Sequence, residues 1–384
     1  MNGAQAAARD ASTAAPTDLP RPGLAARLLS NELPRSRALA VLLVLIVLGL
    51  AFAPFLFPGA KALNVAAKIL VFIVLVASYD LLLGYTGIVS FAHTMFFGIG
   101  AYGIAIALTR LGPAWGAVAL GVAGAVALSI VLSAVIGLFS LRVRAIFYAM
   151  ITLAVAAAFQ TLASQLSEIT GGEDGLSFKV PEILTPAFSF VGAPFLGVSL
   201  DGRLLAYYLL LVAAALLFLV MLRIVNSPFG RVLQAIREND FRAEAIGYRT
   251  VVYRTLSNVL AAVFATLAGA LLALWLRYNG PDTSLSFEVM LDVLLMVVIG
   301  GMGTMYGAVI GAALFILAQS YLQDVMRIGS TALSGLPFVG EILGALFSPD
   351  RWLLWLGVLF ILSVYYFPAG VVGRLRAVKS RSPR

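Results

Sequence analysis

Side chains able to act as acids, bases or metal ligands are few in this sequence and lie far apart. His93 is the only histidine, and the lack of cysteine excludes thiolate, disulfide and zinc-finger chemistry. Asp80, Glu288 and Asp292 lie beside or within long apolar runs, where a carboxylate costs roughly 2.5–3.5 kcal/mol and must face protein or water. Asp80 and Asp292 are candidates for a polar path, whereas Glu288 fits an external interface. No pair of these groups has the spacing of a catalytic site, so we predict no catalytic residue and no metal site.

The glycine-rich strings do not indicate a nucleotide site. Gly98-x-Gly100-x-x-Gly103 matches the dinucleotide-binding pattern, but no soluble strand precedes it and no acidic residue follows about 20 positions on. The phosphate-binding pattern G-x-x-x-x-G-K-[ST] does not occur. We therefore predict that this chain binds no cofactor, and that any ATP-driven step depends on another chain.

The composition places these residues in a membrane protein. Hydrophobic residues make up 61% of the chain and charged residues only 11%, whereas about a quarter of an ordinary soluble chain is charged. The apolar runs are about 20 residues long, as a membrane-crossing helix requires, and lack the ten-residue alternation of a barrel. The net charge of +8 comes from basic residues beside these runs, so it indicates topology and not a nucleic-acid partner. The predicted fold class is all-α integral membrane.

Ten transmembrane helices are predicted, with both chain ends cytoplasmic. The spans are 38–57, 64–84, 88–109, 115–139, 145–163, 204–224, 255–276, 288–300, 305–322 and 352–367. With the N-terminus inside, eighteen of the 26 Lys and Arg residues are cytoplasmic, as the positive-inside rule requires. The transmembrane permease-type domain, 38–367, lies between a disordered tail at 1–37 and a basic tail at 368–384. We expect an external loop at 164–203 and an external surface helix at 332–346; whether the short span 288–300 crosses fully is left open.

Two glycine-bearing breaks interrupt the apolar runs at corresponding positions. The first covers 83–91 and the second 278–287, and each reads Tyr-x-Gly and then, after a few residues, Ser-Phe. They are offset by five spans, which predicts two inverted five-helix repeats. Helix N-termini at Ser90 and Ser286 would direct positive dipole ends toward a substrate carboxylate. The predicted substrate path contains Gly84, Tyr85, Gly87, Ser90, Phe91, His93, Ser286 and Phe287.

Several residues near these breaks have two interpretations. His93 is either a packed, hydrogen-bonded histidine or a residue of the path. Asp80 lies one turn before Gly84, where backbone N–H groups freed by the break could bind its carboxylate. A double G-x-x-x-G on the ninth span is typical of close helix packing, with a functional gap as the alternative. Its members are Gly303, Gly307 and Gly311.

The segment 226–254 is a charged island between apolar runs. Its arginines indicate a cytoplasmic location by the positive-inside rule. Apolar and charged residues at helical spacing in its first part predict a short amphipathic helix. Such a helix at the cytoplasmic surface is typical of docking onto a soluble partner. The residues assigned to docking are Phe229, Gly230, Arg231, Ala235, Ile236, Arg237 and Glu238.

Five stretches resemble the second permease subunit of bacterial branched-chain amino acid ABC importers, the LivM-like type. They are DLLLGYTGIVSFAHTMFFGIGAYG (80–103), AIFYAMITLAVAAAFQTL (145–162), TGGEDGLS (170–177), SPFGRVLQAIREND (227–240) and LLMVVIGGMGTMYGAVIGA (294–312). The resemblance implies a substrate-translocating subunit of the bacterial inner membrane. It also implies a homologous permease, two cytoplasmic ABC ATPases that hold ATP and Mg²⁺, and a periplasmic substrate-binding protein as partners.

Individual positions match the motifs of this family. The first break matches at Gly84, Tyr85, Gly87, Ser90 and His93, and an external T-G-G-x-D-G motif matches at Thr170, Gly171, Gly172, Asp174 and Gly175. The resemblance implies that this external loop is a lid or a contact for the binding protein; a glycine-rich turn held by Asp174 is the alternative. It also implies that the helix beginning near Phe229 docks in a groove of the ATPase.

The substrate stays open at this point. The subfamily includes permeases for urea and short amides as well as branched-chain amino acids. Asp80 departs from the family, whose members commonly carry Asn there. An ion-coupled secondary carrier is a further alternative, which would work without ATPase partners and lose coupling in Asp80→Asn.

Overall fold

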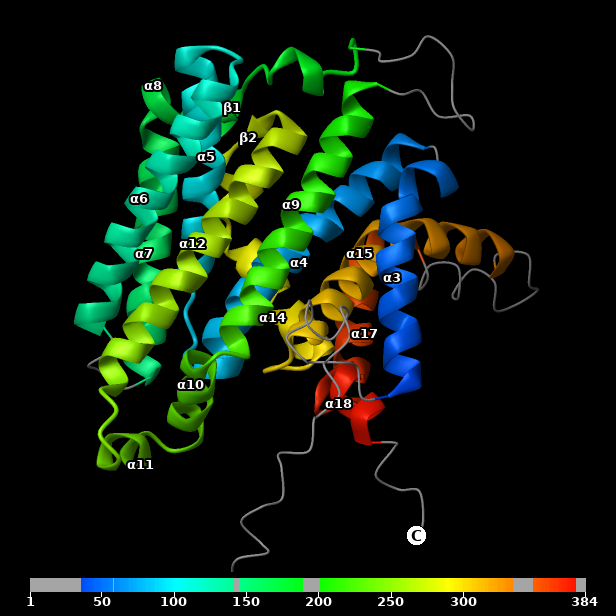
Figure 1. The fold of residues 1–384 in the computed structure, drawn as a ribbon. Helices are drawn as coiled ribbons and strands as arrows, with labels where there is room; N and C mark the ends of the chain where they lie inside the picture. The colour runs from blue at the N-terminus through cyan, green and yellow to red at the C-terminus, as the bar shows by residue number, and fades with distance from the viewer. Residues whose placement is uncertain (1–35, 58, 141–144, 189–200, 334–347, 378–384) are drawn as a thin grey trace, which may run out of the picture. The chain divides into compact units, whose positions relative to one another are not determined.

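The computed structural model describes residues 36–57, 59–140, 145–188, 201–333 and 348–377, all within one compact unit, Pro34–Arg384. This described part contains ten candidate membrane spans (Figure 1). Their helices are α3 (Arg37–Leu56), α4 (Ala60–Thr86), α5 (His93–Leu111), α6 (Trp115–Ser140), α7 (Ala145–Gln165), α9 (Gly202–Val225), α12 (Thr250–Leu276), α14 (Phe287–Gly300), α15 (Met305–Leu333) and α17 (Trp352–Tyr366). Each predicted span falls on one of these helices, so the prediction of an all-α membrane protein with ten spans is confirmed.

Shorter elements connect the long helices. They are α8 (Ser167–Thr170), α10 (Pro228–Glu238), α11 (Asp240–Ala245), α13 (Pro281–Ser284), α18 (Gly370–Ala377), the strands β1 (Leu176–Ser177) and β2 (Tyr278–Asn279), and 3-10 turns at Gly172–Asp174, Glu182–Leu184 and Pro349–Arg351. Ser36, Asp201 and Ser286 begin α3, α9 and α14 by accepting a bond from the main-chain N–H three residues on, at 3.1, 3.1 and 3.4 Å. These bonds satisfy donors that the first turn of a helix leaves without partners.

The helices α4 and α12 form the centre of the bundle. α4 is buried along nearly its whole length, and α12 packs against α4, α5 and α6. A Cβ atom at Gly100 of α5 would lie 1.8 Å from the carbonyl oxygen of Thr266 in α12, and one at Gly269 of α12 would lie 1.8 Å from that of Phe97. The backbones of α5 and α12 therefore touch at positions where only glycine fits. In α3, α6, α7, α9 and α17 only a minority of the residues is buried.

Two helices of the first five spans have counterparts of similar length among the last five. α4 and α12 have 27 residues each, and α6 and α15 have 26 and 29. Both α4 and α12 end in a left-handed residue, Gly87 and Arg277. Both are followed by a segment without a long helix, after which α5 or α14 begins. These two segments are the glycine-bearing breaks of the sequence.

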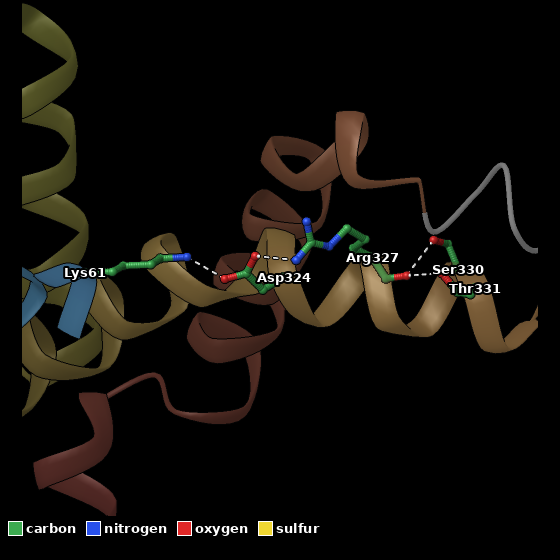
Figure 2. A network of polar contacts seen from close by, with 5 residues as sticks. All are labelled: Lys61, Asp324, Arg327, Ser330 and Thr331. Carbon is green, nitrogen blue, oxygen red and sulfur yellow. Dashed lines mark hydrogen bonds and ion pairs between the residues drawn. The ribbon is translucent and has the colours of Figure 1, made fainter. Parts of the chain in front are cut away.

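A polar network joins α4 to the far part of α15. Figure 2 shows Lys61 of α4 pointing at Asp324 of α15, with which it forms an ion pair, while Arg327 lies 3.6 Å from the same carboxylate. The carbonyl oxygen of Arg327 accepts bonds from Ser330 and Thr331, at 3.0 and 2.8 Å. The side chains of Lys61 and Asp324 are 57% and 40% exposed, so solvent screening makes the pair a weak contribution to stability.

Deeper in the bundle, a second polar chain crosses three helices. Lys68 Nζ of α4 donates to Gln319 Oε1 of α15 at 3.2 Å, and Gln319 Nε2 donates to Asp292 Oδ2 of α14 at 3.2 Å. Asp292, a candidate for the path, therefore has a protein partner that offsets the cost of placing a carboxylate in a span.

Some boundaries differ from the prediction. α5 begins at His93 and not at 88, because the chain leaves the helical conformation at Gly87 and resumes it only after Ala92. α12 begins at Thr250 and not at 255, and α15 continues to Leu333. α18 lies in the region predicted as a basic tail, 368–384. The tail at 1–37, the surface helix at 332–346 and part of the loop 164–203 lie largely or partly outside the described residues.

Candidate functional site

The first break returns the chain into the bundle (Figure 1). α4 ends at Thr86, and residues 87–92 lead back to the start of α5 at His93. Ser78 Oγ and His93 Nε2 are 2.8 Å apart. Ser78 lies more than two helical turns before Thr86, which is roughly 12 Å along α4. α5 therefore begins inside the bundle and not level with the end of α4.

His93 is packed at this internal helix start. Ser78 Oγ donates to the carbonyl oxygen of Leu75 at 2.7 Å, so the imidazole Nε2–H is the donor to Ser78. The Tyr79 ring lies 5.1 Å from the imidazole, and His93 is 2% exposed. These are the contacts of the packed, hydrogen-bonded histidine.

Ser90 does not begin a helix, which corrects the predicted N-terminus there. Its hydroxyl accepts from the N–H of Ala92 at 3.3 Å, a bond within the turn, and α5 has no side-chain cap. The N–H of Phe91 instead donates to Thr152 Oγ1 of α7 at 3.1 Å. Sequence reasoning missed Thr152, because nothing in α7 marks one threonine as the partner of a main-chain group far along the chain.

The second break enters from the other end of α12 and meets the first. β2 and α13 follow α12, and Ser286 then caps α14 as predicted from the sequence. The rings of Phe91 and Phe287 have centroids 5.9 Å apart and are tilted by 53°. Both aromatic residues adjoin a helix start, so the beginnings of α5 and α14 face a common region.

Asp80 binds the turn between α14 and α15. Its carboxylate is 1% exposed, and Oδ1 accepts from the N–H of Gly303 at 2.8 Å. A Cβ atom at Gly84 would lie 2.0 Å from that oxygen and 2.4 Å from the Gly303 nitrogen. The structural role predicted for Asp80 thus has a different partner. Because α4 stays helical through Thr86, no N–H group is freed near Gly84.

Only two of the three predicted packing glycines lie in a helix. Gly303 precedes α15 and has a φ of 77°, so it belongs to the turn. Gly307 and Gly311 face α14, and a Cβ atom at Gly311 would lie 2.0 Å from the carbonyl oxygen of Met296. This is the close approach that small residues permit between membrane helices.

The charged segment forms the predicted amphipathic helix, α10. Ser227 caps it and Pro228 occupies its first turn. Its buried residues are Gly230, Leu233 and Ile236, and α10 packs against α4, α9 and α12. Its exposed residues are Pro228, Arg231, Gln234, Ala235, Arg237 and Glu238. Phe229 stacks on Tyr253 of α12, with ring centroids 5.8 Å apart.

Arg237 connects α10 to the first break. Its Nη1 donates to the carbonyl oxygen of Gly84, and a Cβ atom at Gly87 would lie 3.2 Å from its Cγ. A Cβ atom at Gly303 would lie 2.8 Å from the same Nη1. Arg237 was assigned to the outward docking face, but its guanidinium reaches the bundle. It follows Leu233 by one helical turn, so it borders the buried face of α10.

Sequence reasoning also missed the most exposed large hydrophobic residue of the described chain. Phe241, in α11, is 86% exposed, and Ile246 just beyond α11 is 67% exposed. An ion pair of 3.0 Å between Arg254 and Asp240 holds α11 against α12. A phenylalanine inside the charged string ENDFRAE was the available signal. Because the positive-inside rule assigns this segment to the cytoplasmic side, we call the exposed residues of α10 and α11, together with Ile246, the cytoplasmic knob.

The external motif forms a tight turn next to α7. Thr170 Oγ1 donates to the carbonyl oxygens of Ala163 and Leu166, at 2.5 and 2.7 Å. The backbone then takes positive φ values at three glycines, which explains the motif because only glycine adopts them without strain. They are Gly171 (78°), Gly172 (66°) and Gly175 (69°).

This turn is tied to the second break. β1 pairs antiparallel with β2, with Leu176 opposite Asn279. A Cβ atom at Gly175 would lie 2.4 Å from the carbonyl oxygen of Asn279. Tyr278 donates to the main-chain oxygen of Asp174 at 3.1 Å. The external motif therefore contacts the second break, as α10 contacts the first.

Comparisons with known proteins agree on one family. The family model described as "Branched-chain amino acid transport system / permease component" matches residues 61–374. The high-affinity branched-chain amino acid transport system permease protein LivM of Salmonella typhimurium is 27% identical over 77% of this chain and 71% of its own length, and that of Escherichia coli has the same values. A probable branched-chain amino acid transport permease protein of Methanocaldococcus jannaschii is 26% identical over 65% of this chain and 68% of its own length.

Proposed function

Because this chain belongs to the family of branched-chain amino acid transport system permease components, we propose that it is the membrane-spanning subunit of an ATP-driven importer. The cargo is a branched-chain amino acid that a periplasmic binding protein delivers. Two cytoplasmic ABC ATPases supply ATP hydrolysis, so this chain itself needs no catalytic group. A homologous permease subunit completes the transmembrane part.

The contact between Arg237 and Gly84 is the observation that carries this proposal. A docking helix can drive transport only if its movement is transmitted to the helices within the membrane. α10 packs on α4, α9 and α12, and its arginine reaches the end of the buried helix α4. A push on the cytoplasmic knob would therefore act on the first break directly. In this scheme the ATPase grips the exposed Phe241 and the polar face of α10.

We propose that the chain lies in the bacterial inner membrane with both of its ends in the cytoplasm. It is supported by the excess of Lys and Arg in the segments assigned to that side. The two five-helix halves would be inverted repeats, which the equal lengths of α4 and α12 and their left-handed ends support.

The substrate path would pass where the two breaks meet. Phe91 and Phe287 offer apolar surface to the side chain of a hydrophobic amino acid. The N-terminus of α14, capped by Ser286, carries a positive dipole end suited to its carboxylate. Contacts of this kind are weak, as a path requires, because a substrate that binds tightly leaves slowly.

Alternating access would arise because each break is held from a different side of the membrane. The cytoplasmic knob acts on the first break, and the external turn acts on the second through β1 and β2. Closure of the ATPases would move α10 and shift the helix starts against each other at Phe91 and Phe287. The external turn would respond to the binding protein in the same way.

Reconstitution tests this function. Proteoliposomes with both permeases, the ATPases and the binding protein should accumulate leucine only with ATP. Phe241→Asp should prevent copurification of the ATPases and abolish uptake, while the conservative Phe241→Leu should retain both. Uptake by this chain without ATPases, or normal ATPase binding by Phe241→Asp, would contradict the proposal.

A further inference from the structure

A polar cavity of about 290 Å³ lies at the end of α12, away from the cytoplasmic knob. It is lined by Asn64, Pro186, Arg203, Trp275, Leu276 and Arg277. These residues come from the start of α4, the start of α9, the end of α12 and the loop after β1. Neither the two breaks nor the external motif contributes a lining residue, so this cavity is separate from the site described above.

Two arginines converge on the cavity without an acidic partner. Arg203 Nη2 donates to Asn64 Oδ1 at 3.1 Å, and its guanidinium lies 5.7 Å from the centre of the Trp275 ring. Arg277 Nη2 donates to the carbonyl oxygen of Leu184 at 3.0 Å. Neither arginine forms an ion pair with a residue of the described ranges. Two positive charges thus share one small space.

Arg277 also has a hydrogen-bond donor that the described residues leave without an acceptor. Its Nε is buried and has no hydrogen-bond partner among the described residues. Burial, together with the charge of Arg203, lowers the pKa of Arg277 below its usual value. A buried N–H donor without an acceptor is unfavourable.

The backbone conformation of Arg277 also indicates a special role for this residue. Its φ of 58° makes it the only non-glycine residue with positive φ in the described part of the chain. It ends α12, a position where glycine is the usual choice and where Gly87 ends α4. The turn into β2 explains the left-handed conformation but not the arginine. Non-glycine residues in such strained conformations cluster at functional sites.

We propose that this cavity binds the carboxylate of the amino acid before it enters the path. The choice of amino acid as ligand rests on the proposed transport function. The planar guanidinium groups of Arg203 and Arg277 match a carboxylate, to which arginine commonly makes paired hydrogen bonds. Trp275, Leu276 and Pro186 supply apolar walls for the side chain of the same molecule. The volume of about 290 Å³ is enough for one amino acid.

The test uses the full chain in phosphatidylcholine nanodiscs, with Trp275 as the only tryptophan. Replacing the other three tryptophans by phenylalanine makes its fluorescence a reporter of the cavity. Leucine and isovalerate, which share a carboxylate, should change the emission saturably, and leucinamide should not. Arg203→Gln and Arg277→Asn should each weaken leucine binding roughly 10- to 100-fold, because each removes charged hydrogen bonds. Asparagine is chosen at 277 because it tolerates the left-handed conformation.

Arg110→Gln is the matched control, because Arg110 donates to the carbonyl oxygen of Glu168 outside the cavity. It should leave leucine binding unchanged. Equal binding of leucinamide, an absent signal, or full affinity in both cavity variants would overturn the proposal. Loss of the leucine signal in phosphatidylglycerol nanodiscs would assign the cavity to a lipid phosphate and overturn it too.

A carboxylate of the docked binding protein is the remaining candidate for the group that occupies the cavity. Weaker docking in both cavity variants, without any leucine signal, would overturn the small-molecule assignment. Wild-type uptake in the complete reconstituted system separates the two proposals. Uptake without a leucine signal refutes the cavity alone, whereas no ATP-driven uptake with active partners refutes the proposed function.

Discussion

Replacing Arg237 by glutamine should uncouple ATP hydrolysis from transport. The Arg237 guanidinium donates a hydrogen bond to the carbonyl oxygen of Gly84, and this bond joins α10 to the end of α4. A hydrogen bond from a charged donor contributes about 1.5–3 kcal/mol, and the lower end applies because Arg237 is exposed. A loss of about 1.5 kcal/mol corresponds to roughly a tenfold fall in the population of molecules in which the cytoplasmic knob and the first break move together.

The assay is leucine uptake per ATP hydrolysed in proteoliposomes. Arg237→Gln should keep ATPase binding and hydrolysis while uptake per ATP falls about tenfold. Arg231→Gln is the matched control, because Arg231 lies exposed on the same helix and forms no ion pair with a described residue. An unchanged ratio for Arg237→Gln would refute this reasoning. Loss of ATPase copurification would instead restore the sequence-based assignment of Arg237 to the docking face.

Three further substitutions test separate contacts. Gly175→Ala would place a Cβ 2.4 Å from a carbonyl oxygen of β2 and should lower uptake without loss of ATPase binding, whereas Gly112→Ala, with the same sign of φ but open space, should be milder. Gly311→Ala should destabilise the protein by about 1–3 kcal/mol in thermal unfolding, because its Cβ would lie 2.0 Å from a carbonyl oxygen of α14; Gly329→Ala in the same helix meets nothing within 4 Å and should not. Asp80→Asn should keep uptake because an amide oxygen still accepts the 2.8 Å bond, and Asp80→Ala should lose it; loss of coupling in Asp80→Asn would favour an ion-coupled carrier.

The spans were predictable because a membrane helix can be recognised from a run of consecutive apolar residues. Runs of about 20 apolar residues decide where a helix crosses, and α10 was recognisable from the spacing of Leu233 and Ile236. Helix ends were harder. The start of α5 at His93 depends on a left-handed Gly87 and on a bond between Phe91 and a distant threonine.

The contacts that join the functional segments were not predictable, because they connect residues far apart in the sequence. Asp80 and Gly303 are separated by 223 positions, and Arg237 and Gly84 by 153. Local patterns identified Asp80 as a carboxylate beside a span that must face protein or water, and Arg237 as part of an amphipathic helix. Which N–H and which carbonyl they bind depends on how the two halves pack. For the same reason the residues assigned to docking include Gly230 and Ile236, which are buried against the bundle, and the contact of Arg237 with Gly84 was missed.

The most direct measurement is the accessibility of a single cysteine at Phe241. The chain has no native cysteine, so Phe241→Cys introduces one reporter on the cytoplasmic knob. A membrane-impermeant maleimide should label it from the cytoplasmic face of inside-out vesicles, and bound ATPase should block the reaction. Labelling from the periplasmic face of intact cells, with no reaction from the cytoplasmic face, would contradict the account.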